Sequence, residues 1–216
     1  MQRHLVLRLL WYYVGLVITG LGYALVIAQG LGASPWDILH LGLTGQTGIP
    51  LGRVVQITGA FVILVDVLLG MRPNLGMVLN MLSLGPITQF LLERLAAPAT
   101  LPGRWLMLVA GIVVSGIGTA FYASADLGAG PRDSLMIGLT RKLGLPVAIV
   151  KNGLDVMVSL IGWWLGGPLG AGTVAVAVGL GPSVQLGFHL ASLLARLRPL
   201  HGIVRPVPLR SATARQ

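Results

Sequence analysis

Six long apolar stretches occupy most of this chain and constrain its fold more than any other feature. Each has close to the ~20 residues that an α-helix needs to cross a hydrocarbon core about 30 Å thick. They run over residues 9–28, 51–69, 75–92, 105–125, 147–165 and 171–194. Because 55% of the residues are apolar and only 10% are charged, the sequence predicts an all-α, polytopic protein in a lipid bilayer. Its 31 glycines then mark places where helices pack closely.

The chain also contains an internal repeat. A shift of 96 residues aligns residues 8–89 with residues 104–185 without a gap, and 29 of the 82 aligned positions are identical. Each half therefore forms one unit of three long spans and one short segment, and the two units make a single transmembrane domain over residues 1–195. Because each unit crosses the membrane three times, the second unit has the opposite orientation in the membrane. The sequence thus predicts two inverted repeats, an arrangement that many secondary transporters have.

Basic residues bear on this topology, because they concentrate in cytoplasmic loops. With six spans and cytoplasmic termini, 12 of the 15 lysines and arginines lie inside. Five of these are arginines of a tail, residues 196–216, which we predict to be cytoplasmic and disordered. Four parallel spans per half would place 13 inside, so charge does not choose between the two arrangements. Length favours six spans, because about a dozen residues make a poor crossing but a good re-entrant or interfacial helix.

The two short segments begin with "LGASPWD" and "LGAGPRD". In the first, Ser34 suits a helix N-cap, Pro35 the first helical position and Asp37 the third, where a carboxylate meets unbonded backbone amides. The second copy has the same pattern, with Gly130 at the cap and Asp133 at the third position. Capping explains the two aspartates fully. A second interpretation is that they face a water-filled vestibule and receive a cation or proton, because ionisable groups are costly at membrane depth.

The two copies differ at one informative position, where Trp36 of the first corresponds to Arg132 of the second. Tryptophan is typical of an outer interfacial belt, and arginine is typical of the cytoplasmic side. Inverted repeats of three spans each would therefore place Ser34 outside the membrane and Gly130 inside it.

Together with the motif "GWWLGGPLGAGTV", the two short segments give the chain a resemblance to a known group. The chain resembles the YczE-like branch of the YczE/YyaS/YitT group of bacterial integral membrane proteins, over nearly everything up to the tail. The resemblance implies a multi-pass protein of the bacterial cytoplasmic (inner) membrane and supplies no substrate. In that branch the second short helix is followed by an arginine and, four residues on, a glutamate. The positions that match here are Lys151 and Asp155.

Other polar residues in the spans allow two interpretations each. Lys151 and Asp155 share a helix face, either as a structural ion pair or as a gating or coupling element. Polar residues at repeat-equivalent positions would either line a central cavity or form interhelical hydrogen bonds. Asp66 is predicted to reach the cytoplasmic interface. The substrate or coupling candidates are Asp37, Asp133, Arg132, Lys151, Asp155, Gln56 with its equivalent Asn152, and Gln89 with its equivalent Gln185.

Catalytic signatures are missing from the sequence. The chain has no cysteine, HExxH, G-x-S-x-G or P-loop motif, so we expect neither an enzyme nor a cofactor. We expect no metal site, because His40 and His189 lack ligand partners at helical spacing. The net charge of +9 is spread between the spans, so we expect no nucleic-acid partner. The leading class is a small secondary transporter or permease for a small-molecule or ion substrate. The alternatives are a non-transporting scaffold or regulatory partner of another complex and, third, an intramembrane enzyme.

A chain with so few spans and so many glycines on its helices is expected to form a homodimer in the bilayer. Native mass spectrometry of the protein in nanodiscs should therefore give twice the mass of one protomer. A single species of protomer mass, both in mild detergent and in nanodiscs, would contradict this expectation.

Overall fold

The computed structural model describes residues 2–128 and 130–195, with side chains from residue 5 onward. All regular secondary structure in this part of the chain is helical and there is no strand, so the all-α prediction is confirmed. Its helices are α1 (Gln2–Ala28), α2 (Pro35–Thr47), α3 (Leu51–Leu68), α4 (Leu75–Leu92), α5 (Leu101–Ser124), α6 (Pro131–Leu143), α7 (Val147–Trp164) and α8 (Ala171–Leu194). The predicted tail at residues 196–216 lies outside the described residues.

Six of these helices are long and apolar enough to cross a membrane. Their bounds match the predicted stretches within a few residues, except that α1 begins earlier, at Gln2. α2 and α6 have 13 residues each and are therefore about 20 Å long, too short to cross. They are the two short helices that the sequence predicts.

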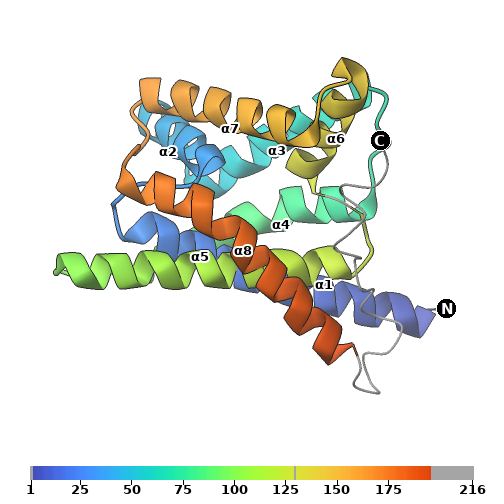
Figure 1. The fold of residues 1–216 in the computed structure, drawn as a ribbon, viewed down its shortest axis with the longest axis horizontal. Helices are drawn as coiled ribbons and strands as arrows, with labels where there is room; N and C mark the ends of the chain where they lie inside the picture. The colour runs from blue at the N-terminus through green and yellow to red at the C-terminus, as the bar shows by residue number, and fades with distance from the viewer. Residues whose placement is uncertain (1, 129, 196–216) are drawn as a thin grey trace.

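The helices of the two halves interlock instead of forming separate bodies. α1 and α5 lie side by side and run in opposite directions, and α8 crosses them diagonally (Figure 1). α4 also packs against α1, α2 packs against α7, and α3 packs against α6. Each short helix therefore rests on a long helix of the other half.

Glycines bring α1 and α5 into backbone contact. A Cβ added to Gly22 would lie less than 3.0 Å from backbone atoms of Ser115, and one added to Gly118 would lie equally close to the backbone of Thr19. The 96-residue shift converts the first contact into the second, because Gly22 corresponds to Gly118 and Thr19 corresponds to Ser115. One contact pattern is therefore used twice between these two helices.

The loop before each short helix is held by the other half of the molecule. The backbone amide of Gly76, at the start of α4, donates to the carbonyl of Leu127 at 2.9 Å. The equivalent amide of Gly172, at the start of α8, donates to the carbonyl of Leu31 at 2.8 Å. These bonds fix where α6 and α2 begin.

One pair of helices breaks the equivalence of the halves. α3 packs against α4, whereas α7 makes no comparable contact with α8. Gly85 of α4 lies against the backbone of Gly52, but a Cβ added to the equivalent Gly181 of α8 would meet nothing within 4 Å. We call these two places the α3/α4 seam, which is closed, and the α7/α8 seam, which is open.

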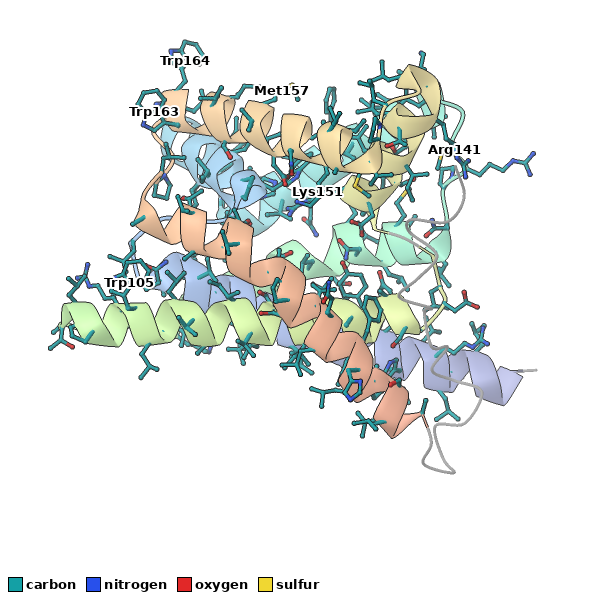
Figure 2. All side chains as sticks on the ribbon, in the orientation of Figure 1. Trp105, Arg141, Lys151, Met157, Trp163 and Trp164 are labelled. Atoms are coloured by element: carbon teal, nitrogen blue, oxygen red, sulfur yellow. The ribbon has the colours of Figure 1, made fainter. Side chains whose placement is uncertain are left out.

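The molecule is polarised along its long axis. Trp105, Trp163 and Trp164 lie at one end, and Arg141 lies at the other (Figure 2). α1 begins and α8 ends at the Arg141 end (Figure 1).

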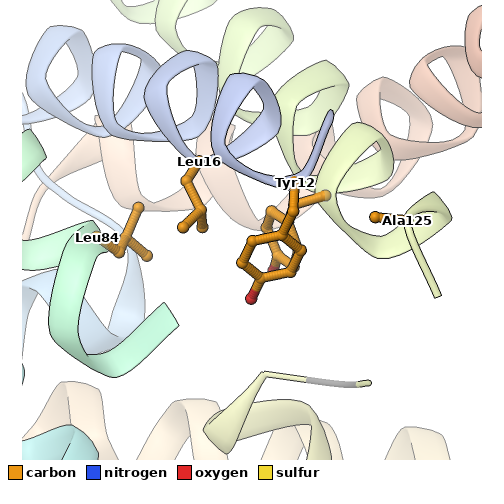
Figure 3. Packing of buried hydrophobic residues seen from close by; sticks show 5 residues of the cluster. Tyr12, Leu16, Leu84 and Ala125 are labelled. Atoms are coloured by element: carbon orange, nitrogen blue, oxygen red, sulfur yellow. The ribbon is translucent and has the colours of Figure 1, made fainter. Parts of the chain in front are cut away.

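A buried aromatic cluster joins α1, α4 and α5 (Figure 3). The rings of Tyr12 and Tyr122 meet edge to face, with centroids 5.6 Å apart. The Tyr12 hydroxyl donates to the carbonyl of Gly76 at 2.6 Å, so its polar group is satisfied inside the protein. The members of the cluster are Tyr12, Leu16, Leu84, Tyr122 and Ala125.

We expect Gly22→Ala to destabilise the protein, because the added methyl group would press on the α5 backbone. Overpacking of this kind costs about 1–3 kcal/mol. Gly153→Ala is a matched control in α7, where a Cβ would meet nothing within 4 Å. It should leave stability unchanged or raise it by about 1 kcal/mol through better helix propensity. Thermal unfolding in detergent measures both, and equal midpoints for the two variants would contradict the close contact.

Candidate functional site

The loop that precedes α2 folds back into the protein. Gln29 is fully buried, and its side-chain amide donates to the carbonyl of Gly32 at 2.9 Å. Its side-chain oxygen accepts the backbone amide of Leu31. Because Leu31 is also held by α8, the chain turns inward here, and α2 begins within the molecule.

Both short helices begin as the sequence predicts. α2 starts at Pro35, and the hydroxyl of Ser34 accepts the backbone amide of Asp37 at 3.4 Å. α6 starts directly after Gly130, which has no side chain for capping, and the carboxylate of Asp133 turns back to the Gly130 amide. The predicted helix starts are confirmed. Each aspartate therefore stabilises a helix start, whatever else it does.

The first turns of α2 and α6 meet inside the protein. The guanidinium carbon of Arg132 lies 4.9 Å from the centre of the Trp36 ring, in cation–π contact. The expectation that Trp36 and Arg132 lie at opposite interfaces of the membrane is therefore wrong, and the sides from which Ser34 and Gly130 are reached stay a prediction. Both loops turn inward before their helices begin, so the two side chains meet beside the middle turns of α3 and α4.

A buried acid–imidazole pair lies in the first two turns of α2. Ser34 donates its hydroxyl to one carboxylate oxygen of Asp37, and Nδ1 of His40 lies 3.7 Å from the other. Nε2 of His40 lies 2.8 Å from the hydroxyl of Thr58 on α3. Asp37 is 3% exposed and His40 is 1% exposed. Sequence reasoning singled out Asp37 but did not connect it with His40, although their spacing of three residues on one helix indicates the pair; Thr58 joins them only because α2 packs on α3.

The equivalent carboxylate, Asp133, is in a different environment. It is exposed to solvent although it lies deep between the helices. Arg132 and Lys151 are within electrostatic reach of it, and Asn80 of α4 lies beside Gly130 at the start of the same turn. Because α6 packs against α7 and Lys151 belongs to α7, Asp133 lies on the α7 side of the molecule.

A small cavity lies between these two environments. Its volume is about 20 Å³, which suits one water molecule. Thr58, the partner of His40, lines one part of it, and Asn80 and Arg132 line another. One water there would touch polar groups from both halves of the molecule.

Three tyrosines surround the aspartates, and sequence reasoning missed all of them. Tyr23 of α1 is within electrostatic reach of Asp37, and Tyr12 and Tyr122 are within reach of Asp133. A hydroxyl within an apolar span needs a partner inside the protein, and this is the signal that could have found them.

Asp66 of α3 is buried within the protein, so the prediction that its side chain extends outward into the interface is wrong. The residue is fully covered because it faces α6. The hydroxyl of Ser134 lies close to its carboxylate, but neither oxygen meets hydrogen-bond geometry within the described residues.

Lys151 and Asp155 form the ion pair that their spacing predicts, with Nζ 2.6 Å from a carboxylate oxygen. Their equivalents in α3 are Val55 and Gly59, which line the central cavity. The pair therefore occupies the face of α7 that corresponds to the inward face of α3. Its side chains are 59% and 25% exposed, so the attraction contributes at most about 1 kcal/mol, and both the structural and the coupling interpretation stay open.

Two glutamines hold the α3/α4 seam closed. Gln56 donates its side-chain amide to the carbonyl of Leu82 at 2.8 Å. That carbonyl lacks its usual donor, because the residue four positions on is Pro86. Gln89 accepts the backbone amide of Gly52 at 2.8 Å, in the first turn of α3, where amides have no intrahelical acceptor.

The open α7/α8 seam has residues equivalent to those of the closed seam, but in the part of the chain that the structure describes these do not form the equivalent hydrogen bonds. Asn152 and Gln185 are exposed, and within the described residues neither makes the bond of its equivalent, because α7 stands apart from α8. Pro182 deprives the carbonyl of Val178 of its donor, as Pro86 does for Leu82. Of the two interpretations that the sequence allows, interhelical hydrogen bonding therefore describes Gln56 and Gln89, and over residues 2–128 and 130–195 it does not describe Asn152 and Gln185.

The candidates thus fall into three places, of which one is the open seam with Asn152 and Gln185. Asp37, Asp133, Arg132 and Lys151 gather around the meeting of the short helices, with Asp155 paired to Lys151. Gln56 and Gln89 line a groove of about 340 Å³ along the closed seam. Its other lining residues are Pro50, Gly52, Arg53, Pro86, Phe90 and Glu93. Within the described part of the chain, no three His, Asp or Glu side chains gather closely enough to hold a metal ion.

These features define an all-helical, multi-pass membrane protein with charged residues near its centre. The chain belongs to a family of unknown function, DUF6198, whose sequence model matches residues 6–188. The predicted resemblance is confirmed.

Three relatives cover most of the chain. The "uncharacterized membrane protein YczE" of Bacillus subtilis is 38% identical over 180 residues, 82% of this chain and 84% of that protein. An "uncharacterized protein" of Haemophilus influenzae is 36% identical over 182 residues, 84% of each chain. The "uncharacterized protein YyaS" of B. subtilis is 25% identical over 175 residues, 78% of this chain and 86% of that protein. No solved structure matches the chain at a significant level.

The meeting of α2 and α6 can be tested by cross-linking, because the native chain has no cysteine. We expect Trp36→Cys combined with Arg132→Cys to be joined by a short bismaleimide in native membranes. Trp36→Cys combined with Lys142→Cys is the control, since Lys142 lies about 15 Å further along α6. Gel mobility after cleavage of a protease site placed between the two halves reports the link. Equal yields for both pairs would contradict the meeting.

Proposed function

We propose that the protein is a small secondary transporter of the bacterial cytoplasmic membrane, which moves a small-molecule or ion substrate by alternating access. The observation that carries this proposal is the difference between the two seams. α3 packs against α4, so their seam is closed, while the equivalent α7 stands apart from α8, so their seam is open. If the halves exchanged these conformations, the central site would open to the other side of the membrane.

The proposal includes two inverted repeats of three spans each. The antiparallel run of α1 and α5 supports this, because equivalent helices of inverted repeats cross the membrane in opposite directions (Figure 1). The paired contacts of Gly22 with Ser115 and of Gly118 with Thr19 also support it, because a two-fold axis between α1 and α5 would interchange them.

In this proposal both termini are cytoplasmic. The excess of basic residues in the loops at the Arg141 end favours that end as the cytoplasmic one, and the tryptophans at the opposite end suit the outer interface (Figure 2). α7 begins and α8 ends at the Arg141 end, so the open seam would face the cytoplasm (Figure 1).

The charged residues at the centre fit a transporter better than a structural protein. Ionisable side chains at membrane depth are costly and usually line a substrate or ion pathway. Asp133 is exposed, and the equivalent Asp37 is buried. A carrier caught with one side open would have this pair of environments.

Cysteine accessibility tests the proposal without knowledge of the substrate. We expect Asp133→Cys to react with a membrane-impermeant maleimide in inside-out vesicles and not on intact cells. Asp37→Cys should react from the outside, about tenfold or more slowly, because the outward-open state is a minor one. Lys142→Cys and Arg94→Cys, both at exposed positions, serve as markers of the inner and outer sides.

Reaction of both aspartate positions from the same side would contradict alternating access. An Asp37→Cys variant that is unreactive from both sides would favour the alternative, a non-transporting scaffold or regulatory partner. That alternative also predicts a stoichiometric partner in a pull-down.

A further inference from the structure

The acid–imidazole pair of α2, Asp37 and His40, is buried and titratable. It takes no part in the contacts of the α3/α4 seam or the α7/α8 seam. Nδ1 of His40 faces a carboxylate oxygen of Asp37 at 3.7 Å and has no other partner among the described residues. The second oxygen of Asp37 accepts the Ser34 hydroxyl, so the carboxylate is held in place on both sides. An N–H on Nδ1 is therefore aimed at an anion, and this fixes the ring and leaves Nε2 as the nitrogen that gains or loses a proton.

Thr58 can satisfy Nε2 in either protonation state. Its oxygen lies 2.8 Å from Nε2 and 2.9 Å from the carbonyl of Val54. When His40 is neutral, the Thr58 hydroxyl donates to Nε2. When His40 carries a second proton, Nε2–H donates to the Thr58 oxygen, and the hydroxyl turns to Val54. The change costs one rotation about a side-chain bond and leaves no buried group without a partner.

We infer that Asp37, His40 and Thr58 form a proton-binding site, which takes up one proton at Nε2 of His40, and that this proton is the ion coupled to transport. The second half of this inference rests on the proposed function, and the first half does not.

The central cavity gives the proton a route. It has room for about one water molecule, and its lining includes Thr58 on the side of His40 and Asn80 on the side of Asp133. Asp133 is exposed to solvent in this conformation. A proton passing from solvent along Asp133, the cavity water and the Thr58 hydroxyl would reach Nε2 by transfers between neighbouring polar groups.

The charged groups around His40 act on its proton affinity in opposite directions. Arg132 of α6 is within reach of both Asp37 and His40, and it opposes the added positive charge. Asp37 favours that charge. From the other elements, Tyr23 of α1 faces Asp37, and Lys151 of α7 faces Asp133 rather than His40. A protonated His40 would therefore repel Arg132 from its place over Trp36, where the two short helices meet.

The site belongs to one half of the molecule. The repeat equivalents of His40 and Thr58 are Met136 and Leu154, which cannot bind a proton. We therefore assign one proton to each protomer.

Nuclear magnetic resonance of histidine labelled with ¹³C and ¹⁵N, in nanodiscs, tests the site. The His40 signals are identified by their loss in His40→Gln. We expect His40 to change protonation state within the pH range over which the protein stays folded, and Asp37→Asn to lower its proton affinity about tenfold or more, because the carboxylate is lost while Arg132 remains. The exposed His189 is the internal control, and its signals should be the same in Asp37→Asn as in the native protein.

Thr58→Ser and Thr58→Val form a matched pair for the hydroxyl. Thr58→Ser should titrate as the native protein does, and Thr58→Val should lower the proton affinity of His40, because the imidazolium then lacks an acceptor at Nε2. A His40 that keeps one protonation state over the whole range, or that does not respond to Asp37→Asn in a folded protein, would overturn the inference.

The spectra report proton binding whether or not the protein transports anything, so the two proposals can fail separately. If the cysteine experiment contradicts alternating access while His40 titrates as expected, the proton site stands without its coupling role. If alternating access holds and His40 does not titrate, the proton-binding site is refuted while the proposed transport stands.

Discussion

The contact between α1 and α5 is the constraint on which the rest of the structure depends. Gly22 and Gly118 leave no room for a Cβ, so these two helices meet in one register and cannot slide past one another. That register sets where the loops after α1 and α5 begin. Because Gly76 and Gly172 then hold those loops from the opposite half, α2 and α6 start inside the molecule and meet there. The burial of Asp37 and the position of Asp133 both follow from this arrangement.

Much of the fold could be predicted from the sequence because its causes are local. The length of an apolar stretch decides whether a helix can cross, and six such stretches became six long helices. The starts of α2 and α6 were predictable for the same reason, since Ser34, Pro35 and Asp37 make their contacts within one turn.

The centre of the molecule could not be predicted, because its contacts join residues that are distant in sequence. The positive-inside rule assigns loops to sides of the membrane, and it says nothing about a loop that turns back into the protein. Trp36 and Arg132 were therefore placed on opposite sides, although they touch. Asp66 was misplaced in a similar way. Its repeat equivalent is Gly162, which packs directly on the backbone of α2, and that comparison would have indicated a buried position.

The prolines inside α4 and α8 have an energetic consequence. Each one leaves a carbonyl without a donor, and a carbonyl in that condition within a membrane costs free energy until a neighbouring helix supplies an N–H. The Leu82 carbonyl has such a donor in Gln56, and the Val178 carbonyl has a matching candidate in Asn152. Closing one seam while opening the other would trade one satisfied carbonyl for another, so the number of hydrogen bonds would stay the same. The two conformations would then lie close in free energy, which two interconverting states of one protein require.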